Sequence, residues 1–141
     1  MIDNDLLELY TDISRQQLSY VERRVNAFGL HAGQAAVIAA LGRYETCSQK
    51  ELAELRHVSA PTISVMVARM EREGLVQKLS ADRYSRICLT EKGKRLSEAL
   101  ARDRLGEPER IFAGLSPEER SMAEKVFLTI SRNLQRLSDK E

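Results

Sequence analysis

The feature that most constrains this chain is a three-residue turn, 56–58, between two short helical segments. Ser48 and Glu51 form an S-x-x-E capping box that begins the first segment. Ser59 is a good N-cap for the second, and Gly74 is a typical residue at a helix end. The two helices therefore follow directly on one another, as a helix-turn-helix.

The second of these helices, 59–74, has two unlike faces. On a helix of about 100° per residue, four bulky apolar side chains form one stripe, Ile63, Met66, Val67 and Met70. The opposite face is small, hydroxylated and basic, with little bulk to keep it from lying against another surface. Such a face suits a helix that enters the major groove of DNA. An ordinary amphipathic surface helix shows the same pattern, so the neighbouring segments decide between the two interpretations.

A small hairpin follows the helix pair. Residues 75–79 and 86–89 have the composition of two short strands, and the connection between them carries Arg83. A helix-turn-helix followed by such a hairpin is a winged helix, whose wing arginine can reach phosphates or a minor groove. The alternative is a solvated turn with an incidental arginine.

The rest of the chain is helical in pattern. Apolar spacing predicts helices over 5–28, 32–43 and 90–105 and a last helix over 116–137, with a break at Gly106 and Pro108. With 30% charged and 5% aromatic residues, the chain is expected to be mainly α with a small β-hairpin. It shows no signal peptide and no apolar run long enough for a bilayer, so we expect a cytoplasmic protein without membrane contact.

Charge is concentrated in the middle of the chain. Between residues 43 and 95 there are eleven Lys or Arg and seven acidic residues, whereas the whole chain carries only +1. A basic centre between slightly acidic ends suits a nucleic-acid-binding module with helices that bind a partner.

Four motifs at these spacings resemble the MarR family of bacterial transcriptional regulators. They are Ser-Gln-Lys-Glu-Leu-Ala (48–53), Val-Ser-Ala-Pro-Thr-Ile-Ser (58–64), Glu-Arg-Glu-Gly-Leu-Val (71–76) and Leu-Thr-Glu-Lys-Gly (89–93). The resemblance implies a homodimer formed by residues 1–30 and 106–141, with a winged helix-turn-helix lobe over 31–105. It implies a repressor on a palindromic DNA operator and, as in many members, a small-molecule pocket between the dimer helices and each lobe.

The resemblance also assigns candidate site residues. Those expected at DNA are Ser59, Ala60, Pro61, Thr62, Ser64, Val65, Arg69, Arg72, Arg83 and Arg86. The arginines suit phosphates or the minor groove, and Val65 suits a thymine methyl group. The plausible polar lining of the effector pocket is Tyr20, Arg24, His31 and Arg43.

The chain departs from the family pattern at two positions. The wing of the family usually reads Asp-x-Arg, but Ala81 stands at the place of the aspartate and Asp82 is one position off. The turn of the helix pair usually holds a glycine, and here that place is His57. Histidine tolerates a left-handed backbone better than β-branched residues do, so we expect the turn to form with some strain.

Two alternatives remain open from the sequence. Cys47 and Cys88 fall on strands expected to pair, which raises redox sensing, although their side chains should lie on opposite faces of the sheet. The other alternative is a winged helix that binds a protein and never DNA. The two histidines are far apart and no catalytic or cofactor motif is visible, so we expect neither an enzyme nor a metal or cofactor site.

Overall fold

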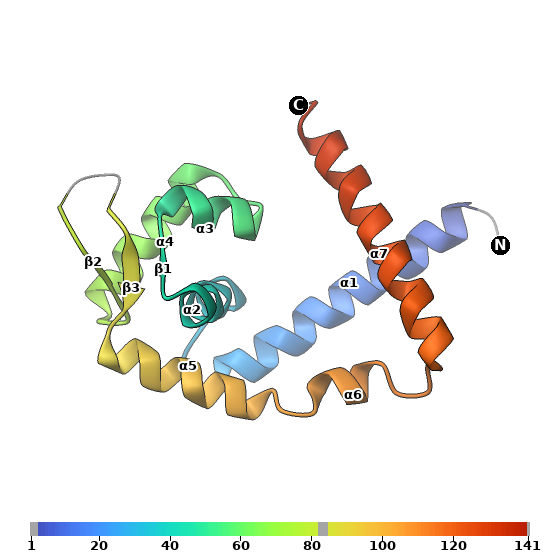
Figure 1. Ribbon diagram of the computed structural model, residues 1–141, viewed down its shortest axis with the longest axis horizontal. Helices are drawn as coiled ribbons and strands as arrows, with labels where there is room; N and C mark the ends of the chain where they lie inside the picture. The colour runs from blue at the N-terminus through green and yellow to red at the C-terminus, as the bar shows by residue number, and fades with distance from the viewer. Residues whose placement is uncertain (1–2, 82–84, 141) are drawn as a thin grey trace. The chain divides into compact units, whose positions relative to one another are not determined.

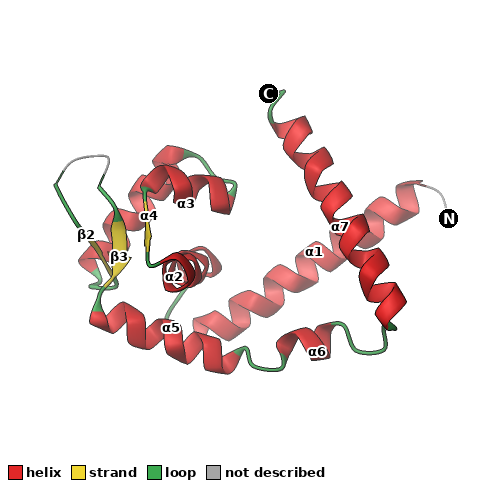
Figure 2. Ribbon diagram, viewed as in Figure 1, coloured by secondary structure: helices red, strands yellow, loops and turns green. Residues whose placement is uncertain are grey.

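The computed structural model describes residues 3–81 and 85–140, which form helices and one small sheet (Figures 1 and 2). The elements are α1 (Asp3–Asn26), α2 (Ala32–Tyr44), β1 (Thr46–Cys47), α3 (Gln49–Arg56), α4 (Ala60–Arg72), β2 (Val76–Lys78), β3 (Ile87–Leu89), α5 (Glu91–Asp103), α6 (Glu107–Ile111) and α7 (Pro117–Ser138). The chain divides into two compact units, Met1–Asp103 and Arg104–Glu141. The first unit holds the predicted winged helix.

The sheet has the strand order β1-β3-β2, and both pairs are antiparallel. Thr46 lies opposite Cys88, and Cys47 lies opposite Ile87. The short segment before the helix pair is therefore the outer rung of the wing sheet, as the sequence predicted. This pairing attaches the base of the wing to the start of α3.

The core of the first unit lies between α2, α3, α4 and β3. Its completely buried members include Val37, Ile38, Leu52, Ile63, Val67, Met70 and Ile87. Three of the four residues of the predicted α4 stripe are among them, and Met66 is half-buried against the cluster. The apolar stripe thus fixes which face of α4 remains outside.

The turn between α3 and α4 has the left-handed backbone expected from the sequence. His57 adopts φ 53° and ψ 43° and ends α3. The amide of Val58 donates to the carbonyl of Ala53 at 3.1 Å, which satisfies the helix end. Ser59 then accepts a 3.3 Å hydrogen bond from the amide of Thr62 and caps α4.

The Leu-Thr-Glu-Lys-Gly motif joins the wing to α5. Thr90 receives a 3.1 Å hydrogen bond from the amide of Gly93 and donates its hydroxyl to the carbonyl of Gly74. A Cβ at Gly93 would collide with the carbonyl oxygen of Leu75. Only glycine allows the first turn of α5 to approach the backbone of Leu75, just before β2, this closely.

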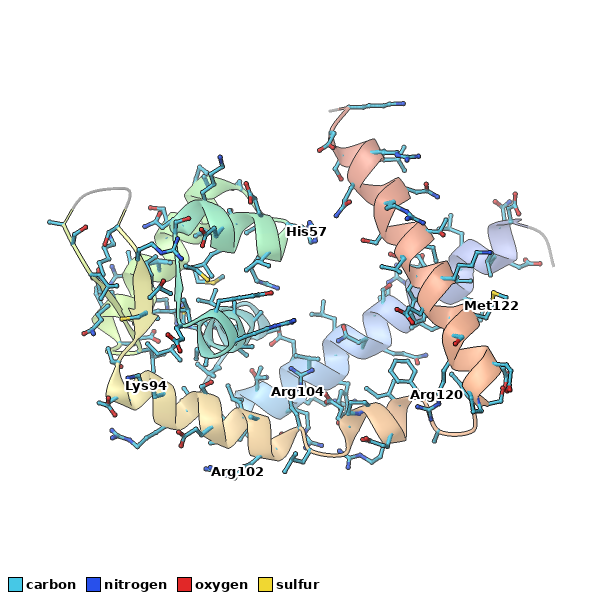
Figure 3. The ribbon with its side chains drawn as sticks, in the orientation of Figure 1. His57, Lys94, Arg102, Arg104, Arg120 and Met122 are labelled. Carbon is cyan, nitrogen blue, oxygen red and sulfur yellow. The ribbon has the colours of Figure 1, made fainter. Side chains whose placement is uncertain are left out.

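The second unit contains α6 and α7. The predicted capping box is present, with Ser116 and Glu119 exchanging hydrogen bonds of 2.9 and 3.1 Å. The guanidinium of Arg120 donates to the carbonyls of Phe112 and Leu115 and fixes the α6–α7 turn (Figure 3). The chain breaks at Gly106 as predicted, but Pro108 lies inside the short helix α6, which was not expected from the sequence. In the described part of the chain, no helix has the length and apolarity needed to cross a membrane.

The left-handed turn gives a prediction for stability. A residue with a Cβ destabilises the folded state by about 1–2 kcal/mol in this left-handed conformation. Glycine avoids that strain but lowers the stability by about 0.4–1 kcal/mol, because its unfolded chain has more conformational entropy. We therefore expect His57→Gly to raise the free energy of unfolding by about 0.5–1 kcal/mol, measured by urea denaturation. The matched control is Gly74→Ala, at φ 76°, which should lower it. A lower stability of His57→Gly would show that the imidazole contributes more than the strain costs.

Candidate nucleic-acid interface

The outer face of α4 is open along its first two turns. Ala60, Pro61, Thr62, Ser64 and Val65 are all exposed, and Val65 is 70% accessible. A valine this exposed contributes nothing to the core. The side chains are short, so the backbone of the helix can approach a flat or grooved partner closely.

The hydroxyl groups at the start of α4 are already arranged by one another. The side-chain oxygens of Ser59 and Thr62 lie 2.8 Å apart in a hydrogen bond, while Ser59 also caps the helix. Their positions are therefore fixed before any partner arrives. Ser64 has no side-chain hydrogen bond within the described residues and is free to donate or accept.

The two arginines of α4 differ in their surroundings. Arg69 forms a 3.0 Å ion pair with Glu73, four residues along the helix. The other carboxylate oxygen of Glu73 accepts a 3.4 Å hydrogen bond from the buried side chain of Gln34 on α2. Arg72 is exposed and has no partner in the part of the chain that the structure describes. Arg72 is thus the unengaged cation of this helix.

The wing is described only in part. Arg83, the expected wing-tip residue, and Asp82 lie outside the described residues, and Ala81 is exposed. The prediction that Arg83 contacts DNA therefore remains a prediction from the sequence.

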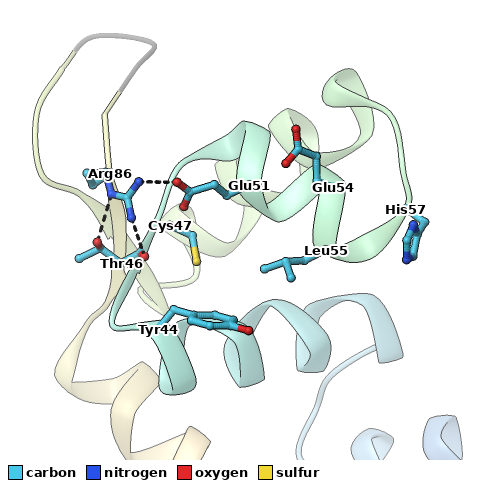
Figure 4. A pocket seen from close by; sticks show the side chains of 8 residues that line it. All are labelled: Tyr44, Thr46, Cys47, Glu51, Glu54, Leu55, His57 and Arg86. Carbon is cyan, nitrogen blue, oxygen red and sulfur yellow. Dashed lines mark hydrogen bonds and ion pairs between the residues drawn. The ribbon is translucent and has the colours of Figure 1, made fainter. Parts of the chain in front are cut away.

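Arg86, also expected at DNA, holds the base of the wing together. Its guanidinium donates to Glu51 at 2.8 Å, to the Thr46 hydroxyl at 3.1 Å and to the Thr46 carbonyl at 2.9 Å (Figure 4). These bonds join the foot of β3 to β1 and α3. The guanidinium of Arg86 already has three acceptors within the protein and would have to share or exchange them to contact DNA. The assignment of Arg86 to DNA therefore stays a prediction.

The ion pair changes the titration of both partners. The hydrogen bond from Arg86, followed by that from the Ser48 backbone, lowers the pKa of Glu51. The same carboxylate raises the pKa of Arg86. Both side chains are solvent-exposed, so the pair orients the strand and helix more than it stabilises them.

No local pattern in the sequence indicated the Arg86–Glu51 bond or the Gln34–Glu73 bond. Each joins residues 35 or more positions apart, and neither follows a local spacing rule. The available signal was the strand pairing of β1 with β3, which places the foot of the wing beside the first turn of α3.

The four candidate effector residues do not form one group. Arg24 lies 5.5 Å from the ring centroid of Tyr20 and donates to the Asp103 carboxylate at 3.0 Å, so these two residues meet at the end of α5. His31 precedes α2, whereas Arg43 lies in its last turn. A helix of this length separates them by roughly 18 Å.

The two cysteines are free and face opposite sides of the sheet. Cys47 is buried in the core, and Cys88 is half-buried on the other face beside Gln77. Burial, then the neighbouring Glu51, raises the pKa of the Cys47 thiol, while Arg86 lowers it. The expected geometry, which does not favour a disulfide within one chain, is confirmed.

Comparison with known proteins gives a consistent result. Residues 28–86 match the sequence model of the MarR family. The chain is 25% identical to the HTH-type transcriptional regulator YybA of Bacillus subtilis (strain 168), over 94% of this chain and 91% of the relative. The chain is thus similar to MarR-family regulators along the predicted winged helix. Members of this family are transcription regulators and not enzymes.

Solved structures of MarR-type proteins share the fold. The MepR–DNA complex of S. aureus superimposes with a TM-score of 0.81 at 21% identity, covering 89% of this chain and 94% of that chain. A MarR family transcriptional regulator from Listeria monocytogenes, in complex with a 26mer DNA, superimposes with a TM-score of 0.80 at 20% identity. The match covers 95% of this chain and 90% of that chain. These structures confirm the winged helix predicted from the MarR-like motifs.

The Arg86–Glu51 ion pair predicts a pH dependence of stability. Because the pKa of Glu51 is lowered in the folded protein, its contribution is present at neutral pH and is lost as pH falls through that lowered pKa. Glu51→Gln should therefore melt at a lower temperature than the parent at pH 7, and the difference should shrink as the pH falls through the lowered pKa of Glu51. Thermal unfolding followed by circular dichroism measures both profiles.

The matched control is Glu54→Gln on the same helix, since Glu54 has no side-chain partner within residues 3–81 and 85–140. Its melting temperature should follow that of the parent at every pH. A difference between Glu51→Gln and the parent that persists at low pH would show that the loss does not come from the ionised carboxylate.

Proposed function

We propose that this protein binds a palindromic DNA operator as a homodimer and represses transcription. The observation that carries the proposal is the outer face of α4, which is small-chained, hydroxylated and basic while its opposite face is locked in the core. MepR and the Listeria regulator, both solved with DNA, share this fold. A protein that regulates transcription in this way would work in the cytoplasm.

In this proposal, the first two turns of α4 enter the major groove. Thr62 and Ser64 would reach base edges, Val65 would contact a thymine methyl group, and Arg69 and Arg72 would bind phosphates. Because the base-reading side chains are short, few direct base contacts form. Sequence-dependent groove shape would then supply much of the specificity.

The dimer would form through the terminal helices, residues 1–30 and 106–141. In α7 no residue is buried, and the exposed apolar set is Met122, Val126, Phe127, Leu128, Leu134 and Leu137. The exposed apolar side chains of α1 are Leu6, Leu7, Leu9, Ile13 and Leu18. Apolar surface of this extent on two long helices is what a second copy of the chain would cover.

A small molecule would modulate the DNA affinity of the dimer. The pair formed by Tyr20 and Arg24 is the part of the predicted effector lining with defined geometry. His31 and Arg43 would need other elements to complete a site around them.

The proposed function is tested by titrating the protein into DNA from upstream of its own gene. Fluorescence anisotropy at moderate salt should show saturable binding that excess competitor DNA does not abolish. Binding that competitor DNA removes completely would favour a winged helix that serves as a protein-interaction module.

A wing arginine at phosphate predicts a change in salt dependence. Arg83→Ala should weaken binding to all DNA sequences and reduce the slope of log K against log salt by about one. The control is Arg102→Ala, an exposed arginine on α5 that the proposal does not place at DNA (Figure 3). An unchanged slope in Arg83→Ala would remove Arg83 from the interface.

The dimer predicts that one charge on α7 separates the subunits. Phe127→Glu should shift the mass measured by sedimentation velocity from a dimer towards the 16.0 kDa monomer, because the carboxylate would be buried in an apolar contact. Glu124→Gln, also exposed on α7, should leave the dimer intact. A Phe127→Glu variant that stays dimeric at micromolar concentration would place the interface elsewhere.

A further inference from the structure

A cavity of about 600 Å³ lies in the first unit between the end of α2, β1 and α3 (Figure 4). Its lining includes Tyr44, Cys47, Glu51, Glu54 and Leu55. None of the four predicted effector residues, Tyr20, Arg24, His31 and Arg43, lines it. The cavity is thus a site that the sequence did not suggest.

Most polar groups of the cavity are already bonded within the protein. One Glu51 carboxylate oxygen accepts from Arg86 and the other from the Ser48 amide. Arg86 gives its remaining hydrogen bonds to Thr46. The cation and the first carboxylate therefore neutralise each other, and neither needs a ligand.

Glu54 is the exception among the charged groups. Its carboxylate has no hydrogen bond or ion pair within the described residues, and it lies one helical turn beyond Glu51 on α3. His57 also lines the cavity. With the Arg86–Glu51 pair neutral and the histidine counted as neutral, Glu54 leaves the described lining with a formal charge of −1. An anion would meet this charge and find no unengaged arginine or lysine among the lining residues.

The remaining lining is largely apolar. Leu55 and Tyr44 are 47% and 49% exposed, high fractions for large side chains beside a cavity. Burial raises the pKa of the Cys47 thiol, so this group adds no negative charge to the lining at neutral pH. The Tyr44 ring already stacks with a cation, since the Arg43 guanidinium lies 5.3 Å from its centroid. An aromatic ring, a leucine and one unengaged carboxylate together favour a cation with an apolar body.

We propose that this cavity binds a small organic cation, with its positive group at Glu54 and its apolar part against Leu55 and Tyr44. The bound molecule would touch both α2 and α3. Because α3 leads through His57 into α4 and is tied through Glu51 to the wing, occupancy would bias the position of the DNA-binding face. This regulatory consequence rests on the proposed function, whereas the binding site itself does not.

The site is tested with benzyltrimethylammonium, a compact cation with one aromatic ring, by isothermal titration calorimetry on the full chain without DNA. We expect saturable binding that Glu54→Gln weakens about fivefold, the effect of one partly exposed charge. Benzenesulfonate, an anion of similar size, should not bind. Glu98→Gln, which removes an exposed carboxylate on α5 outside the cavity, should bind the cation as the parent does.

Three results would overturn the proposal: no binding up to millimolar cation, equal binding of benzenesulfonate, or equal loss in Glu98→Gln. Amide chemical shifts on titration must also move around Tyr44 and Leu55 rather than elsewhere. A parallel measurement of operator affinity with and without the cation tests the regulatory consequence separately. If the protein binds no DNA, the calorimetry still decides whether the site exists.

Discussion

The burial of one stripe of α4 determines the rest of the first unit. Ile63, Val67 and Met70 are completely excluded from solvent, and their burial fixes the rotation of the helix about its axis. Burying side chains of this size contributes roughly 1.5–3 kcal/mol each. A rotation that exposed them would be far more costly than any contact on the outer face could offset. The packing of the core therefore determines which face of α4 is exposed to solvent.

The orientation of the wing depends on a different type of interaction. Its three-stranded sheet has strands of only two or three residues, which is marginal without support. Arg86 supplies that support by binding a β1 carbonyl, a β1 hydroxyl and the α3 carboxylate at once. A planar guanidinium suits this role because its donors have fixed directions. One side chain thereby couples the angle of the wing to the helix pair.

Short spacing rules in the sequence predicted the fold, but they did not predict the hydrogen bonds between residues far apart in the chain. The capping serines, the α4 stripe and the left-handed turn at His57 follow from short spacing rules, and each is confirmed. Even the cysteines were placed on opposite faces, because alternation in β3 depends only on neighbouring residues. The bonds of Arg86 and Glu73, and the cavity beside Glu54, depend on where separate elements meet. No pattern within one helix or strand encodes such a meeting.

The Arg69–Glu73 pair affects how strongly α4 can bind a polyanion. A carboxylate 3.0 Å from the guanidinium occupies the position that a phosphate oxygen would take, and the bond from buried Gln34 holds that carboxylate in place. Glu73 therefore acts as an internal competitor for Arg69. Any polyanion must displace it, so the gain from that contact is the difference between two similar bonds. Arg72 is exposed and has no such competitor among the described residues, so it would contribute its full attraction at each encounter.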